Sequence, residues 1–449
     1  MNISRVLIAN RGEIAVRLIR TCRVLGIETV LAASEADRDS KGAKLADRTV
    51  VIGPPPGSTY LNIPALIKTA LETGAQAIHP GYGFLSEKPE FAQACADSGI
   101  IFIGPKAEHI HKMGNKLVAR TLASECGVPV LPGSEKVRSI EDALRAIELI
   151  GYPVMLKAAA GGGGRGMKIV FEEDREKLKQ VFEEASAEAA TAFGNGTLYV
   201  EKYIANARHI EVQVLGDKHG GAIHLGERDC STQRRHQKLI EEAGAPNISD
   251  KLRGELHDAA LKLVKNISYE NAGTVEFVFD QDEQKFYFLE MNTRLQVEHP
   301  VTEMVTGIDI VREQINIAAG VKLPFSQRDI RFTGHAMECR INAEDPEDNF
   351  RPSPGVITRW EIPQGPGVRV DTHCHQGYMV PIFYDSLIAK IIVHGDGREH
   401  ARRRMLAALD EFSVEGIATT APFLAKVLKT HEFAEGRVNT RILEKACSG

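Results

Sequence analysis

The sequence lacks the features that would place the protein in a membrane, outside the cell or on a nucleic acid. Its seven cysteines include no CxxC pair, which argues against a zinc site or a dithiol redox centre and fits reduced cytosolic thiols. No apolar run approaches the roughly 18 residues that span a membrane, and none near the start is long enough for a signal peptide. The net charge of -5 offers no basic surface to a polyanion. We therefore expect a cytoplasmic protein with no membrane partner and no nucleic-acid partner.

Three common nucleotide-binding signatures are also missing. The first expected turn reads Asn-Arg-Gly-Glu-Ile-Ala at 10–15, without the GxGxxG of dinucleotide-binding folds. A glycine-rich stretch at 158–166 is followed by Met-Lys, whereas a Walker A loop continues with Lys-Ser or Lys-Thr. No protein-kinase catalytic set is present. These absences argue against NAD binding, a P-loop NTPase and a kinase.

The N-terminal part of the 449 residues shows a βαβ pattern, and the length itself predicts about three domains. An apolar run at 3–9 precedes a helical stripe, and a second run follows at 29–33. The stripe consists of Ile14, Leu18, Cys22 and Leu25. A helix at 64–73 and two short strands continue the alternation. The order predicts a doubly wound parallel sheet in a first α/β domain, residues 1–114.

The glycine-rich stretch lies between two apolar segments, 153–157 and 167–171, so a hairpin is predicted. A flexible linker is the alternative for any glycine run, but linkers are polar on both sides. Glycine lets backbone N–H groups approach phosphate oxygens closely, and Lys157 on the first strand adds a point charge. The stretch is therefore predicted to be a phosphate-covering lid.

Five polar residues alternate with apolar ones near the end of the central region. They are Glu290, Asn292, Arg294, Gln296 and Glu298. Side chains two apart on an extended chain share one face, so these would form a polar wall able to hold a cation and an anion side by side. The alternative is a solvated strand face.

A second carboxylate joins this wall across a predicted hairpin. Glu276 lies in an apolar strand at 274–279, a polar turn covers 280–285, and a further apolar strand ends at Glu290. The parity about the turn allows Glu276, Glu290 and Asn292 to face the same side. Carboxylates among aromatic residues need compensation, which Mg²⁺ bound to nucleotide phosphates would supply. The alternative is a salt bridge to Lys or Arg.

The glycine lid, Lys157 and the Glu-Met-Asn-Thr-Arg strand at 290–294 resemble the ATP-grasp superfamily. Five further stretches resemble biotin carboxylases, and the likeness runs over essentially the whole chain. These stretches are at 79–87, 211–214, 227–238, 294–303 and 335–343. The resemblance implies a mixed α/β and α+β fold: a central ATP-grasp domain at 115–330, with a mobile lid at about 131–203, and a mixed β-rich C-terminal domain at 331–449.

The resemblance also implies an ATP site between the lid and the sheet. Its residues would be Lys116 and Lys157 on phosphates, Gly163 and Gly164 in the lid, Glu201, Lys202, Tyr203 and Ile204 at the adenine edge, and His209, Gln233 and His236 in the pocket. Two Mg²⁺ or Mn²⁺ ions would be held by Glu276, Glu290 and Asn292.

The same resemblance places bicarbonate beside ATP. Its ligands would be Lys238, Arg294, Gln296 and the backbone of Val297. Glu298 would be the general base, since bicarbonate becomes a useful nucleophile only as it loses its proton. Arg340 would face the ureido oxygen of biotin, where a fixed guanidinium stabilises developing charge.

The implied activity is carboxylation of biotin through carboxyphosphate, giving ADP and phosphate. No lysine for biotin attachment is evident, so we expect a separate biotin carboxyl carrier protein, carboxyltransferase partners and a homodimer. Acetyl-CoA carboxylase, and hence malonyl-CoA and fatty acid synthesis, is the first expectation; a pyruvate or other acyl-CoA carboxylase is the alternative. More remote alternatives are another ATP-grasp ligase that joins a carboxylate to an amine, and a non-catalytic ATP-sensing subunit.

Overall fold

The computed structural model describes residues 3–54, 57–159 and 167–443. Its N-terminal region is a parallel five-stranded sheet with the strand order β3-β2-β1-β4-β5. The strands are β1 (Arg5–Ile8), β2 (Glu28–Ser34), β3 (Arg48–Gly53), β4 (Ala77–His79) and β5 (Ile101–Phe102). The helices are α1 (Gly12–Val24), α2 (Lys41–Leu45), α3 (Gly57–Tyr60), α4 (Ile63–Thr73), α5 (Pro89–Asp97) and α6 (Ala107–Gly114).

Both faces of this sheet are covered, which confirms the predicted doubly wound arrangement. Val6 and Ile8 of β1 join the apolar cluster that contains α1, whereas Leu7 between them joins the cluster of α4 and α5. Alternate residues of a buried strand face opposite sides, so a continuous apolar run is what such a strand requires. Strand β3 was not predicted, because its residues are only partly buried and its pattern is correspondingly weak.

The centre of the molecule is an antiparallel eight-stranded sheet with the order β14-β13-β10-β11-β12-β15-β22-β20. Its strands are β10 (Ala207–Gly216), β11 (Ala222–Arg234), β12 (Gln237–Ala243), β13 (Asn271–Asp280), β14 (Lys285–Asn292), β15 (His335–Asn342), β20 (Val368–Thr372) and β22 (Leu387–Gly395). The pairing of β12 with β15 carries this sheet across residue 331, so the central and C-terminal regions share one backbone hydrogen-bond network.

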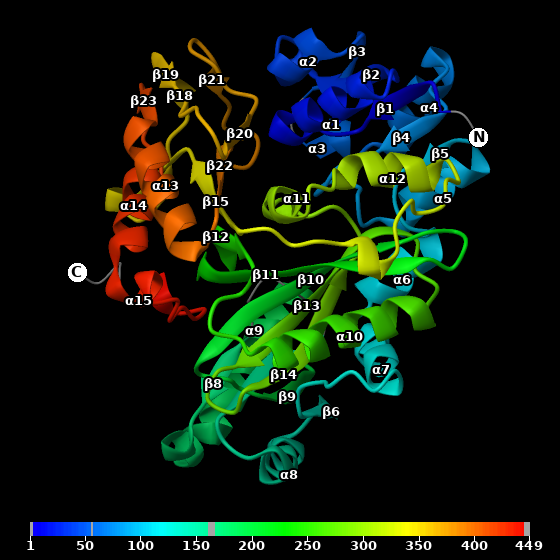
Figure 1. The fold of residues 1–449 in the computed structure, drawn as a ribbon. Coiled ribbons are helices and arrows are strands. Elements are labelled where there is room, and N and C mark those ends of the chain that lie inside the picture. Colours follow the sequence, from blue (N-terminus) through cyan, green and yellow to red (C-terminus); the bar gives the residue numbers. More distant parts are fainter. Residues whose placement is uncertain (1–2, 55–56, 160–166, 444–449) are drawn as a thin grey trace.

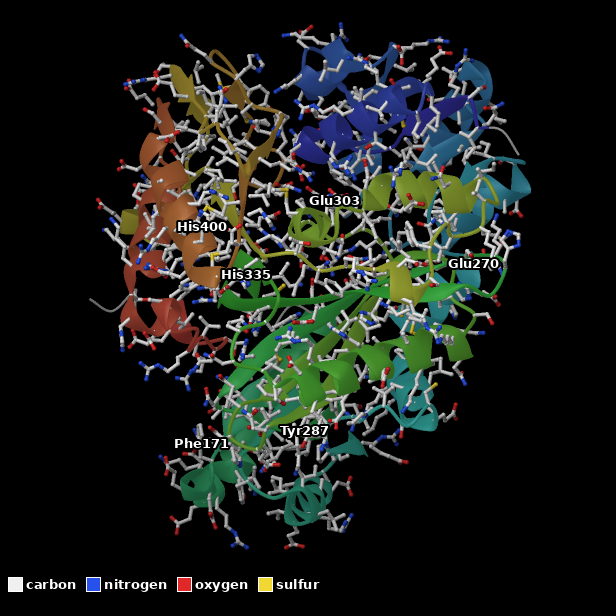
Figure 2. All side chains as sticks on the ribbon, viewed as in Figure 1. Phe171, Glu270, Tyr287, Glu303, His335 and His400 are labelled. Carbon is white, nitrogen blue, oxygen red and sulfur yellow. The ribbon has the colours of Figure 1, made fainter. Side chains whose placement is uncertain are left out.

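Among the helices that pack against the large sheet are α10 (Asp250–Asn266), α11 (His299–Thr306) and α12 (Ile310–Ala318). Glu303 of α11 lies between the N-terminal and C-terminal regions (Figure 2). Its carboxylate is 2.8 Å from Arg17 Nη2 on α1 and 2.7 Å from Arg369 Nη1 on β20. One buried carboxylate therefore ties both outer regions to the helix that follows the polar wall.

A separate four-stranded sheet, β6-β9-β7-β8, lies at the far end of the molecule from the N-terminal sheet (Figure 1). Its elements are β6 (Gly133–Val137), β7 (Val154–Ala158), β8 (Lys168–Val170), β9 (Leu198–Lys202), α7 (Lys116–Glu125), which leads into it, α8 (Ile140–Ile150) and α9 (Leu178–Phe193). Strands β7 and β8 pair antiparallel, confirming the predicted hairpin. The lid residues Gly163 and Gly164 lie outside the described residues.

Beyond β22, the described part of the C-terminal region contains three helices with assigned bounds. They are α13 (Arg398–Glu411), α14 (Ala421–Lys429) and α15 (His431–Ala434). The short strands are β16 (Glu344–Asp345), β17 (Arg351–Pro352), β18 (Gly355–Val356), β19 (Arg359–Glu361), β21 (Met379–Val380) and β23 (Ser413–Glu415). Across the described ranges, no helix is long and apolar enough to cross a membrane.

Candidate active site

Lys238 on β12 lies at the centre of a cluster of buried carboxylates. Its Nζ is 2.6 Å from Glu211 Oε2, 3.0 Å from Glu276 Oε1 and 2.7 Å from Glu298 Oε1. The side chains of Glu211 and Glu298 are fully buried, and that of Lys238 is 14% exposed. Arg228 and Arg340 add positive charge at Glu211 and Glu298, and a histidine lies beside Glu276.

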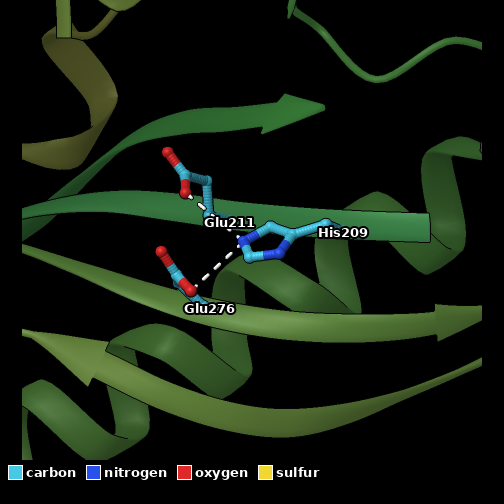
Figure 3. Close-up of side chains that lie close together, drawn as sticks. All are labelled: His209, Glu211 and Glu276. Atoms are coloured by element: carbon cyan, nitrogen blue, oxygen red, sulfur yellow. Dashed lines mark ion pairs between the residues drawn. The ribbon is translucent and has the colours of Figure 1, made fainter. Parts of the chain in front are cut away.

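The histidine is His209, two residues before Glu211 on β10 (Figure 3). Its Nε2 is 3.2 Å from Glu276 Oε2 and 3.6 Å from Glu211 Oε2. Burial lowers the pKa of His209, but the opposing effect of Glu276 and Glu211 is larger and brings the pKa to about 9. A charged imidazolium therefore lies in the Lys238 cluster at neutral pH. The ligand atoms of His209, Glu211 and Glu276 are close enough together to bind one metal ion, but His209 would have to lose its proton to take part.

Glu298 occupies the N-terminal end of α11, between two cations. Its Oε1 faces Lys238, and its Oε2 accepts a hydrogen bond of 2.9 Å from Arg340 Nη2. Burial raises the pKa of Glu298, but Lys238, Arg340 and Arg228 together hold it below its ordinary value. The group is therefore an ionised carboxylate, the state required of a proton acceptor.

Arg340 on β15 is held from two sides. Its Nε donates to Glu241 Oε1 at 2.5 Å, while Nη2 contacts Glu298. Burial lowers the pKa of Arg340, and Glu241, Glu298 and Glu338 raise it above its ordinary value. The guanidinium is a fixed positive charge beside the carboxylate base.

The polar wall is built differently from the prediction, because the strand that should carry it stops halfway. Strand β14 ends at Asn292, and α11 begins at His299 with Glu298 as its N-cap. The segment 293–298 between them is irregular. The alternating pattern therefore describes only Glu290 and Asn292, and tertiary hydrogen bonds place the other three wall residues.

Those bonds run along the irregular segment. Arg294 Nη2 donates to Asn292 Oδ1 at 2.9 Å and Nη1 to Gln296 Oε1 at 2.7 Å. Gln296 Nε2 donates in turn to Glu276 Oε1 at 3.1 Å. Arg294 Nε contacts Glu87 Oε2 of the N-terminal region at 2.9 Å. Three of the predicted bicarbonate ligands, Arg294, Gln296 and Lys238, are thus linked by a chain of hydrogen bonds through Glu276.

The predicted hairpin of Glu276 and Glu290 is confirmed. These residues lie opposite each other on β13 and β14, and Thr274 lies opposite Asn292. Two carboxylates and an amide on neighbouring strand positions form a set of oxygen donors that suits Mg²⁺. Glu276 already accepts from Lys238 and Gln296, so a bound ion would share this carboxylate with them.

The predicted nucleotide residues are divided between the small sheet, with α7 before it, and the β10–β12 part of the large sheet. Lys116 Nζ, at the start of α7, is 3.4 Å from Glu290 Oε2, and Lys157 on β7 is paired with Glu201 on β9. Lys202 Nζ donates to Tyr152 O at 2.7 Å. The remaining predicted residues are placed as follows: Tyr203 donates its N–H to Pro153 O, Ile204 packs with Leu131 and Ala207, Gln233 lies near the end of β11, and His236 lies in the β11–β12 turn.

Four charged residues of the site were missed by the sequence analysis: Glu87, Glu211, Glu241 and Lys390. Lys390 has a fully buried side chain, and its Nζ donates to Val297 O at 2.9 Å and contacts Glu13 Oε1 at 3.0 Å. A signal was present, because a lysine within the apolar strand Leu-Ile-Ala-Lys-Ile-Ile-Val must be paired if it is buried.

Family models match almost the whole chain in three consecutive segments. Residues 2–110 match the biotin carboxylase N-terminal domain, and residues 115–326 match the ATP-binding domain of the carbamoyl-phosphate synthase L chain. Residues 338–445 match the biotin carboxylase C-terminal domain.

Individual proteins align with the chain over nearly its full length. Biotin carboxylase 1 of Bacillus subtilis is 52% identical over 444 residues, covering 98% of each chain. The crystal structure of the biotin carboxylase portion of a pyruvate carboxylase has a TM-score of 0.88 at 51% identity, covering 99% of this chain and 98% of its own. The biotin carboxylase domain dimer of Hydrogenobacter thermophilus 2-oxoglutarate carboxylase, solved with MgADP, ADP and bicarbonate, has a TM-score of 0.93 at 50% identity, covering 99% and 98% of the two chains.

Proposed function

Because the chain belongs to the biotin carboxylase family, we propose that it catalyses the ATP- and bicarbonate-dependent carboxylation of biotin, with release of ADP and phosphate. The observation that carries the proposal is the position of Glu298, an ionised carboxylate between Lys238 and Arg340. One cation lies where an anionic substrate would bind and the other where charge would develop on biotin. The carboxylate between them can serve as base.

The first step joins bicarbonate to ATP. Lys238, Arg294, Gln296 and the Val297 N–H hold the anion, and Glu298 removes its proton as the bicarbonate oxygen attacks the γ-phosphorus. The bond from that phosphorus to the β,γ-bridging oxygen breaks, giving carboxyphosphate and ADP. Bound Mg²⁺ would offset phosphate charge during this transfer, and Glu276, Glu290 and Asn292 are the residues that would hold it.

The second step transfers the carboxyl group. Carboxyphosphate releases CO₂ and phosphate, the phosphate takes the proton of the biotin ureido nitrogen, and that nitrogen attacks CO₂. Arg340 stabilises the charge on the ureido oxygen during this step, because a preorganised guanidinium in a buried site costs no rearrangement. Arg340 already lies within hydrogen-bond distance of Glu298, so we expect both steps to take place close to these two residues.

ATP is assigned to the space between the small and large sheets. We assign the phosphates of ATP to Lys116, Lys157, Gly163 and Gly164. The adenine edge falls to Glu201, Lys202, Tyr203 and Ile204, and His209, Gln233 and His236 line the remaining pocket. This assignment is supported by two ion pairs, Lys116 with Glu290 and Lys157 with Glu201. A phosphate group could replace the carboxylate as the partner of each lysine.

The proposed assembly is a cytoplasmic homodimer that acts on biotin of a separate carrier protein, alongside carboxyltransferase subunits. Its domains are taken as 1–114, 115–330 and 331–449. The solved relatives that come from a pyruvate carboxylase and from a 2-oxoglutarate carboxylase support membership of a larger carboxylase assembly. Acetyl-CoA is our first choice of final acceptor, with pyruvate or 2-oxoglutarate second. Copurification of the untagged partners distinguishes these acceptors.

The test is ADP release by the purified protein with and without bicarbonate and free biotin. The expected result is bicarbonate-dependent release that biotin stimulates. ATPase activity indifferent to both would overturn the proposal. Stimulation by an amine in place of biotin would support a carboxylate–amine ligase, and absence of turnover with intact ATP binding would support a sensing subunit.

A further inference from the structure

Behind Arg340, on the same face of the large sheet, lie two carboxyl groups that the proposed reaction does not use directly. Glu241 on β12 and Glu338 on β15 are opposite each other in the antiparallel register, and both are 0% exposed. Side chains at directly opposed positions share a face, with Cβ atoms about 5 Å apart. Two fully buried carboxyls are therefore neighbours within a sheet.

The nearby cations are already engaged with other acceptors. Arg340 donates from Nε to Glu241 Oε1 at 2.5 Å and from Nη2 to Glu298 Oε2 at 2.9 Å. Lys390 contacts Glu13 at 3.0 Å and donates to the carbonyl of Val297 at 2.9 Å. Neither oxygen of Glu338 has a hydrogen-bond partner among the described residues, and Glu241 Oε2 has none either.

The surroundings of Glu338 do not favour a second ionised carboxylate. Its charged and titratable neighbours are Glu241 from β12, Arg340 from its own strand, Lys390 from β22 opposite Asp371 of β20, Glu298 and His299 from α11, and Glu13 from α1. The remaining neighbours on that face are apolar: Ala336, Ile392 and Val301. Burial, with Glu241 and Glu298, raises the pKa of Glu338 well above its ordinary value despite Lys390 and Arg340.

Glu241 shows the same tendency more weakly. Burial raises its pKa to about 7, with Glu298 adding to the shift and Arg340 and Lys238 opposing it. An unpaired buried carboxylate is costly, whereas a carboxylic acid that donates to a neighbouring carboxylate satisfies both groups. A single proton between the opposed residues would join two of the three unpartnered oxygens, one from each residue, in a hydrogen bond.

We propose that Glu338 and Glu241 form a carboxylic acid–carboxylate pair that holds one proton behind Arg340. The proton keeps the pair at one negative charge, which the Nε of Arg340 matches. Glu338 is then a positioning residue, because loss of the proton would add a second charge that competes with the biotin ureido oxygen for the guanidinium. This role rests on the proposed function, whereas the existence of the pair does not.

The pair itself is tested by infrared difference spectroscopy of the full-length protein across a pH titration. The expected result is a protonated carboxyl C=O band at neutral pH that shifts in D₂O, is lost in Glu338→Gln and changes frequency in Glu241→Gln, where the buried acid loses the carboxylate to which it donates. The pair is overturned if the unsubstituted protein shows no protonated carboxyl band, whether or not either variant folds. It is also overturned if neither substitution alters the band.

Glu242 supplies a matched control on the same strand. It is buried, but Arg398 and His335 pair with it. Burial raises the pKa of Glu242, but the opposing effect of these two partners is larger and brings the pKa to about 2. Glu242 therefore carries no proton at neutral pH. The Glu242→Gln variant is expected to retain the infrared band, and its loss there would assign the band to another group.

The positioning role is tested by pH profiles of ADP release with and without biotin. The biotin-stimulated rate of the unsubstituted enzyme is expected to fall at alkaline pH with a rising biotin KM, as the pair loses its proton. In Glu338→Gln, whose amide mimics the protonated acid, the rate at pH 7 stays within about threefold. Its alkaline limb moves up by about one pH unit or disappears. The rate without biotin keeps its own profile in both proteins.

An unchanged alkaline limb in folded Glu338→Gln overturns the positioning role, because a purely structural glutamate would change stability and not the profile. Failure of the proposed function has a different signature. A protein without bicarbonate-dependent ADP release can still show the shared-proton band.

Discussion

The ion pairs around Lys238 and the Lys116–Glu290 pair of the proposed nucleotide side differ in how far they are buried. Around Lys238 the ion pairs are buried and shared, with the side chains of Glu211 and Glu298 0% exposed. On the nucleotide side, Lys116 is 65% exposed and its partner Glu290 34%. Exposed pairs contribute little to stability, whereas breaking a buried pair strands a charge. The pairs around Lys238 are thus fixed in advance, whereas the solvated Lys116–Glu290 pair of the nucleotide side, unlike the more buried Lys157–Glu201 pair, can be exchanged by a ligand at small cost.

The largest effect is expected at the base. Glu298→Gln keeps the shape and removes the proton acceptor, so bicarbonate-dependent ADP release should fall about 10³-fold. ATP binding, measured by calorimetry, should remain, because Glu298 faces Lys238 and Arg340 and is not an assigned ATP ligand. Unchanged turnover would remove Glu298 from the role of base.

The next effect is on stability. Lys238→Met leaves Glu211, Glu276 and Glu298 without their shared cation and should lower the free energy of unfolding by about 3 kcal/mol. Denaturant unfolding followed by circular dichroism measures this. Adding Glu211→Gln should lower the free energy of unfolding further, because Glu211 also pairs with the fully buried Arg228, which would then lose its carboxylate. A double variant more stable than Lys238→Met would contradict this expectation.

A smaller effect is expected at the metal position that borders the exposed side. Glu290→Gln should raise the KM for MgATP about tenfold while changing stability by less than about 1 kcal/mol, because its ion pair is partly solvated. Titration of Mg²⁺ at fixed ATP separates metal loss from nucleotide loss. A KM independent of Mg²⁺ would exclude Glu290 as a ligand.

The smallest effect is expected at Lys116. Lys116→Ala should leave stability within about 0.5 kcal/mol and raise the KM for MgATP about threefold, since the residue is largely solvated and its proposed role is one phosphate contact. Lys112→Ala, on the preceding helix α6 and in an exposed i,i+4 pair with Glu108, is the control and should change neither quantity. A loss of stability at Lys116 comparable to that at Lys238 would contradict the distinction between the two sides.

The parts of the structure that depend on local pattern could be predicted, and those that depend on distant contacts could not. The strands of the N-terminal sheet other than β3 followed from periodicity, and the Glu276–Glu290 pairing followed from parity about one turn. Segment 293–298 has the alternation of a strand but none of its pairing, because bonds to Glu87, Lys238 and Lys390 fix it from elsewhere. Glu241 and Glu338 are 97 positions apart, so only the fold shows that they are neighbours.

The bonds on segment 293–298 limit how far the parts of this chain can be exchanged. Glu87 of the N-terminal region receives the N–H of Thr293 at 3.0 Å, Lys238 of the central region holds Glu298, and Lys390 of the C-terminal region holds the carbonyl of Val297. A chimaera that takes any one region from a relative can keep every sheet and every side chain that meets substrate. In such a chimaera one of the three residues that hold segment 293–298 would come from the relative and could be displaced. Recombination between relatives should therefore reduce turnover before it prevents folding.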